Sequence, residues 1–162
     1  FYDEALSRGW RIGATGSGDN HNGDWGTATD SRIGIPAPAL TRDEIRSALG
    51  ARRFYSTLDR NIQLSFKADS SEMGSTVAGC SHRFSISARD GDDESFTEVF
   101  LYNSNHDTVA TWYPEPGPFT ISFDMTVRAN DYFYVRIAQE DGGGAISSPI
   151  WVSCSGTAEQ DP

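Results

Sequence analysis

Short segments in which apolar and polar side chains alternate begin at residue 61, and this two-residue period limits the fold more than any other feature. In "NIQLSFKA" (residues 61–68), Ile62, Leu64 and Phe66 fall on one face of an extended chain. Similar segments, separated by clusters of Gly, Pro, Asn and Asp, follow at residues 82–90, 96–103, 107–113, 119–127, 132–138 and 147–153. We therefore expect seven β-strands.

Seven short strands in about 100 residues match the size of an immunoglobulin-like or fibronectin-like β-sandwich. We place this all-β domain at residues 58–156 and treat residues 157–162 as a tail. The acidic stretch "ARDGDDESF", with Asp90, Asp92, Asp93 and Glu94, lies between two expected strands. Clustered carboxylates suit calcium, but the spacing is not that of an EF-hand, and a solvated hairpin turn is the favoured interpretation.

In residues 1–57 the apolar residues follow a different spacing, which indicates helices as well as strands. Helical spacing at residues 2–8 precedes a short apolar run at 10–16, a loop at 17–30 and a second apolar run at 32–37. The segment 40–53 is the clearest helix, with Thr41 and Glu44 placed for a capping box. This α/β pattern gives an α+β fold class overall, in which residues 1–57 form a short α/β unit before the sandwich.

Composition limits the partners and the compartment. The formal net charge is −10, so binding to nucleic acid or to an anionic membrane through a basic patch is not expected. Cys80 and Cys154 are the only cysteines. A disulfide between them is the favoured interpretation and suits a secreted or periplasmic protein, while two buried free thiols are the alternative.

Asp19 and His21 lie in the glycine-rich segment "GATGSGDNHNGDWG" (residues 13–26), directly after the expected strand at 10–16. Side chains two residues apart in an extended segment point the same way, so this carboxylate and imidazole can reach one metal ion. Taken alone, the D-x-H spacing is a weak signal, since an exposed loop histidine is more often solvated.

A longer stretch carries a resemblance. "GWRIGATGSGDNHNGDWG" and the residues after it resemble the C-terminal end of the PHP (polymerase and histidinol phosphatase) metallohydrolases, most closely their CehA/McbA-like subgroup. The matching positions after the D-x-H motif are Arg32, Ala48, Leu49, Arg52, Arg53, Tyr55 and Thr57. The resemblance implies that residues 1–57 are the last part of a distorted TIM-like barrel and that Asp19 and His21 are metal ligands.

The same resemblance implies a parent enzyme that uses divalent zinc, manganese or iron to hydrolyse a small phosphoester or a related substrate. The family's other ligand motifs lie upstream, so the missing N-terminal part of the same protein is the implied partner. No catalytic residue is assigned in this chain, and the fragment alone is expected to be inactive. The alternative hypothesis is a stand-alone extracellular β-sandwich that serves as a binding or structural module without catalysis.

The aromatic residues of the sandwich leave one further choice open. Trp112, Tyr113, Tyr132, Phe133 and Tyr134 are able to line a sugar-binding face, but alternation places most of them in the core. Tyr132 and Tyr134 share a face opposite Phe133, so one set is expected to point outward or to be partly buried.

Overall fold

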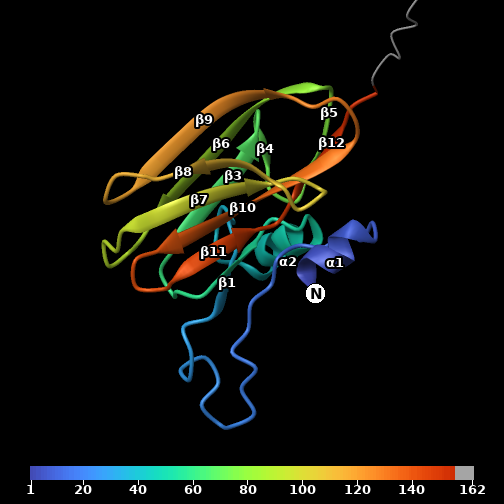
Figure 1. The fold of residues 1–162 in the computed structure, drawn as a ribbon. Coiled ribbons are helices and arrows are strands. Elements are labelled where there is room, and N and C mark those ends of the chain that lie inside the picture. The colour runs from blue at the N-terminus through green and yellow to red at the C-terminus, as the bar shows by residue number, and fades with distance from the viewer. Residues whose placement is uncertain (156–162) are drawn as a thin grey trace, which may run out of the picture.

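Two β-sheets packed face to face form the body of the molecule in the computed structural model, which describes residues 1–155 (Figure 1). The tail predicted at residues 157–162 lies outside the described residues. The first sheet has the strand order β4-β3-β6-β9 and is antiparallel throughout. Its strands are β3 (Gln63–Ala68), β4 (Ser71–Glu72), β6 (Ser81–Arg89) and β9 (Phe119–Thr126).

The second sheet has eight strands and is built around β10 (Asp131–Gln139). β10 pairs with β11 through residues 136–138, with β12 through 131–133 and with β7 through 134–139. The other members of this sheet are β1 (Arg32–Gly34), β2 (Tyr55–Thr57), β5 (Thr76–Ala78), β7 (Phe96–Tyr102), β8 (Thr108–Trp112), β11 (Gly144–Ser147) and β12 (Ile150–Ser153). β5 and β12 form the only parallel pair among the described strands.

The apolar faces of the two sheets enclose the core, as the alternating pattern predicted. Phe84 on β6 is fully buried, and its ring packs at 5.7 Å from that of Phe123 and 5.9 Å from that of Phe66. Phe133 of the opposite sheet meets Phe84 edge to face at 5.6 Å. Aromatic pairs at these separations add stabilisation beyond the burial of their area.

The outer face of β10 is buried as well, because the N-terminal segment covers it. Helix α1 (Tyr2–Ser7) places Leu6 in a second apolar cluster with Tyr132, Tyr134 and Trp151. The hydroxyl of Tyr134 donates a hydrogen bond to Asp3 Oδ1 at 2.8 Å. Burial, together with this carboxylate, raises the pKa of the Tyr134 phenol. The aromatic residues of β10 therefore lie in two apolar layers, one on each face of the sheet.

Helix α2 (Arg42–Gly50) begins where the sequence predicted. Thr41 Oγ1 accepts a hydrogen bond from the backbone N–H of Glu44 at 3.3 Å, which satisfies one unpaired donor of the first turn. Ala48 on this helix is fully buried. The helix is thus fixed by its cap and by one small buried side chain.

The predicted fragment of a TIM-like barrel is wrong, and with it the α+β fold class. Such a barrel needs parallel strands joined by helices. Here β1 and β2 pair antiparallel with each other, and β2 pairs antiparallel with β11 of the sandwich sheet. The apolar run at residues 10–16, predicted as a strand, has no strand conformation. The chain is mostly β, and the domain limits proposed at residues 57 and 156 stay predictions.

A disulfide joins Cys80 and Cys154. Cys80 immediately precedes β6 of the first sheet, and Cys154 immediately follows β12 of the second. The bond therefore links the two sheets at one end of the sandwich. In the described part of the chain, neither helix has the length and apolar character that crossing a bilayer requires.

Candidate functional site

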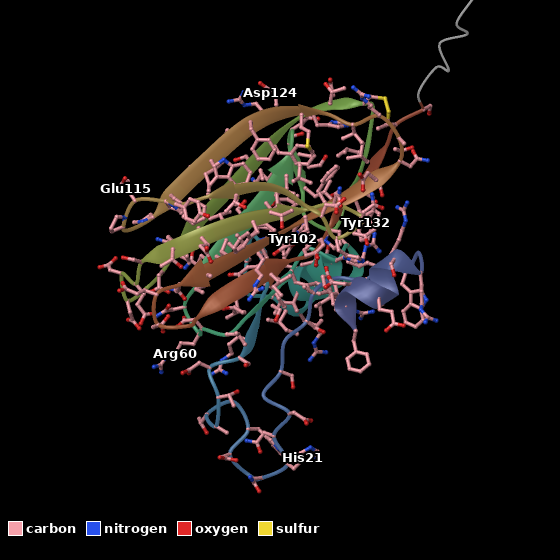
Figure 2. The ribbon with its side chains drawn as sticks, in the orientation of Figure 1. His21, Arg60, Tyr102, Glu115, Asp124 and Tyr132 are labelled. Atoms are coloured by element: carbon pink, nitrogen blue, oxygen red, sulfur yellow. A yellow bond between two sulfur atoms is a disulfide. The ribbon has the colours of Figure 1, made fainter. Side chains whose placement is uncertain are left out.

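The loop that holds Asp19 and His21 projects away from the sandwich, with His21 near its tip (Figure 2). The Asp19 side chain is 95% exposed and that of His21 84% exposed, and His21 Nε2 lies 3.3 Å from Asp19 Oδ1. Within residues 1–155, no third His, Cys, Asp or Glu is close enough to complete a three-ligand site with this pair. Zinc sites use at least three protein ligands. The two residues do face each other, and their assignment as metal ligands stays a prediction.

His82 has a structural environment. The ring is buried, with Nδ1 at 2.8 Å from Asp69 Oδ2 and Nε2 at 3.0 Å from the carbonyl oxygen of Gly79. Both partners of the ring are oxygen atoms, one from a carboxylate and one from the backbone. The hydrogen bond from His82, followed by one from the backbone N–H of Arg83, lowers the pKa of the Asp69 carboxyl. These contacts connect the turn after β3 to the start of β6.

Three carboxylates meet at the end of the sandwich opposite the disulfide. Asp59 lies in the loop between β2 and β3, while Asp90 and Glu94 lie in the loop between β6 and β7. One ligand oxygen from each side chain lies within 4.8 Å of the other two. Asp90 is only 7% exposed, and Asp59 and Glu94 are half-buried. The cluster therefore combines negative charge with restricted access to water.

The charges in this cluster act on each other. The pKa of the Glu94 carboxyl is raised, first by partial loss of water and then by the nearby negative charges of Asp141, Asp90, Asp59 and Asp92. Asp141 comes from a third loop, between β10 and β11. Like charges gathered in this way destabilise one another unless a proton or a cation offsets them.

Gln139, the last residue of β10, reaches the same cluster. Its Nε2 donates a hydrogen bond to Asp90 Oδ2 at 3.0 Å, and the residue is only 4% exposed. Its Oε1 is buried, has no hydrogen-bond partner, and lies beside Gly143 together with Asp141 Oδ1. Asn61 is similar: Nδ2 donates to Asp92 Oδ2 at 2.7 Å, and the buried Oδ1 has no partner. Buried amide oxygens are rarely left unpaired in proteins.

The sequence indicated half of this site. The sequence singles out the acidic stretch 90–94 and favours a solvated turn there over a calcium loop. Asp59, Asn61 and Gln139 were not assigned, since each is an ordinary loop or strand-end residue in the linear pattern. The aromatic residues do not form an exposed sugar-binding face. Tyr132, Phe133 and Tyr134 are buried, and of the five aromatic residues named in the sequence analysis only Tyr113 is largely exposed.

The comparisons with known proteins give distant relatives. No family model matches the chain. It is 28% identical over 174 residues to an uncharacterised protein of Chlamydia muridarum, an alignment covering 91% of this chain and 28% of that protein. An uncharacterised protein of Chlamydia trachomatis serovar D is 26% identical over 174 residues, with the same coverage. The chain thus spans less than a third of the length of these relatives.

Among solved structures, the sulfur carrier protein SoxY from Chlorobium limicola f thiosulfatophilum matches with a TM-score of 0.38 and 13% identity, covering 57% of this chain and 79% of that chain. The fibronectin(III)-like modules of Clostridium thermocellum CbhA match with a TM-score of 0.35 and 17% identity, covering 56% of this chain and 99% of that chain. Such low TM-scores carry no argument about function.

The resemblance to the PHP metallohydrolases is therefore wrong. The relatives found by sequence are uncharacterised, and the chain folds as a β-sandwich with no PHP or TIM-like fragment. Residues 32–57, which supplied most of the matching positions, contain two strands that extend the second sheet. The phosphoesterase activity that the resemblance implied loses its basis.

Proposed function

We propose that this chain is a non-catalytic β-sandwich with a structural role in a longer exported protein. The proposal depends on one observation, which is that residues 1–57 pack onto the sandwich and extend it. They add β1 and β2 to the second sheet, and α1 covers the outer face of β10. A segment that completes and shields a sheet contributes to stability without presenting a reaction centre.

Two further observations support the proposal. The Chlamydia relatives align with nearly the whole of this chain over only 28% of their own length, as expected for a unit contained in larger proteins. The disulfide between Cys80 and Cys154 supports export, because such bonds persist in oxidising compartments and are rare in the cytosol. Secretion or the periplasm is the proposed location.

The structural role is tested at the contact between α1 and the sheet. Leu6 is 2% exposed, whereas Leu40 is 94% exposed. Leu6→Ala removes buried methyl groups and should cost about 2–5 kcal/mol of unfolding free energy. The matched control Leu40→Ala should cost less than about 0.5 kcal/mol. Equal effects of the two substitutions in urea unfolding would show that the N-terminal segment does not stabilise the sandwich.

The absence of catalysis is tested separately with the full chain. Hydrolysis of p-nitrophenyl phosphate is measured with zinc, manganese or iron added, alongside the variants Asp19→Ala and His21→Ala. The rate should equal that of the metal ion alone for all three proteins. A metal-dependent rate that both substitutions remove would overturn the proposal.

A further inference from the structure

The acidic cluster lies where three loops meet. The loops are residues 58–62, 90–95 and 140–143, at the lower left of the sandwich in the view of Figure 1. Hydrogen bonds already connect them: Asn61 in the first loop reaches Asp92 in the second, and Glu140 N donates to the carbonyl oxygen of Ser95 at 3.2 Å. Gln139 connects the end of β10 to Asp90. Residues far apart in the sequence are thus held around one small region.

We propose that this region is a calcium site in which Asp59, Asp90 and Glu94 supply carboxylate oxygens and Gln139 supplies its amide oxygen. The three carboxylates have oxygens within 4.8 Å of one another, a spacing that one cation is able to span. The Asn61 Oδ1 atom is a further neutral donor at the edge of the cluster. Together these side chains offer enough oxygens for a site completed by water.

The unpaired oxygen of Gln139 is the independent observation that points to a ligand. The side chain is 96% buried, since its exposed fraction is 4%. Its Nε2 is bonded to Asp90 at the cluster, while its buried Oε1 lies beside Gly143 and Asp141 Oδ1 and has no donor. A buried acceptor without a partner is energetically unfavourable. A cation placed among these oxygens supplies the missing partner.

A purely structural explanation accounts for only part of the arrangement. Asp90 Oδ1 accepts hydrogen bonds from the backbone N–H groups of Asp92 and Glu94, at 2.7 Å and 3.4 Å, which shapes the turn. Those bonds explain why Asp90 is buried. Asp59 Oδ1 likewise accepts a hydrogen bond from the backbone N–H of Asn61 at 2.7 Å. These bonds do not explain why Glu94 lies beside the two aspartates, or why two buried amide oxygens in the same region have no partner.

The donor set selects the metal. All of the donors are oxygens, which excludes a preference for zinc or copper, since these metals favour nitrogen and sulfur ligands. Calcium takes six to eight oxygen ligands in flexible geometry, whereas magnesium requires a near-ideal octahedron and retains its water. Ligands drawn from separate loops suit the less demanding ion.

Calcium at this position would act on both sheets. The loop 58–62 runs from β2 of the second sheet to β3 of the first, and the loop 90–95 runs from β6 of the first sheet to β7 of the second. The disulfide already links the sheets at the opposite end. The ion would therefore fix the second end, and this role does not depend on the proposed structural function.

The test is calcium-dependent stability of the full chain. With a dissociation constant of about 0.1 mM, as in many extracellular modules, calcium chloride at about 10 mM should raise Tm by roughly 5–10 °C over the protein in EDTA. Isothermal titration calorimetry should give one ion per chain. Magnesium chloride at the same concentration should produce a much smaller shift.

A double variant, Asp59→Asn with Glu94→Gln, separates the site from general charge effects. Both side chains are half-buried, and their neutralisation removes repulsion, so the variant should fold with a Tm in EDTA at least equal to that of the wild type. It should lose the calcium response. The control Asp124→Asn with Glu4→Gln makes the same change in net charge at distant exposed positions and should retain the response.

Three results would overturn the proposal. The first is an unchanged Tm in calcium, and the second is an equal shift with magnesium, which would indicate screening of charge. The third is a calcium response that survives in the Asp59→Asn/Glu94→Gln variant. Each measurement is made on stability or heat of binding, so none depends on a catalytic assay.

Discussion

Of the single bonds in this protein, the disulfide is the one whose removal should lower the free energy of unfolding most. Cys80 and Cys154 are 74 residues apart, so the bond closes nearly half of the chain into a loop. The chain-entropy relation for a closed loop of this size gives about 4–5 kcal/mol of stabilisation, through restriction of the unfolded chain. For a domain of this length, that corresponds to a fall in Tm of roughly 10–18 °C on removal.

The assay compares the oxidised protein, the protein reduced under denaturing conditions and refolded, and the variant Cys80→Ala/Cys154→Ala. Cys154 is buried and Cys80 is half-buried, so reduction is carried out on the unfolded protein to break the bond completely. Urea unfolding should show a lower midpoint for the latter two proteins and a larger m-value, because the unlinked unfolded chain exposes more surface. Agreement between those two proteins excludes an effect of the alanine side chains.

The reasoning would be refuted by either of two results. One is a difference in unfolding free energy below about 1 kcal/mol between the oxidised and reduced proteins, which is far smaller than the chain-entropy relation predicts. The other is the titration of two free thiols in the purified, unreduced protein.

Three further predictions concern single side chains. Phe84→Ala should cost about 3–5 kcal/mol in urea unfolding, because the ring is fully buried among other aromatic rings, and a cost under about 1 kcal/mol would contradict this packing. Thr41→Ala should cost about 1 kcal/mol through loss of the α2 cap, with Thr41→Ser as the control that restores it. Asp69→Asn should destabilise the protein at pH 7 and lose this effect in acid. The lowered pKa of Asp69 gives stability that is present above the ordinary carboxyl pKa near 4 and disappears as the pH falls through the lowered value. A wild-type advantage that persists unchanged at pH 2 would exclude the bond to His82 as its source.

The sequence predicted seven strands of the sandwich because their signal is local, and it missed the short strands β4, β5 and β11. Alternation in 61–68 and 82–90 reports which side chains face inward, and the structure buries Leu64, Phe66 and Phe84 accordingly. The cap at Thr41 is equally local, since it depends on residues three positions apart. These features need no knowledge of the rest of the chain.

The first 57 residues were misinterpreted for the opposite reason. The middle of the run at residues 10–16 lies against the sandwich: Ala14 N donates to Ser148 Oγ at 3.2 Å, and Gly13 packs against Phe54 and Ser148. A continuous apolar run does not distinguish a buried strand from a segment that covers a sheet. The resemblance to a metallohydrolase motif then led to the prediction of a barrel fragment, which the tertiary contacts do not form.

By itself, the sequence determined where the seven expected strands of the sandwich form, which faces of β3 and β6 turn inward, and where α2 begins, because backbone geometry and side-chain period act within a few residues. Only the tertiary structure decided that β2 pairs with β11, that β10 is buried on both faces, and that Asp59 and Gln139 meet Asp90. Those outcomes depend on contacts between residues far apart in the chain. Their energies arise only when the sheets and loops are assembled.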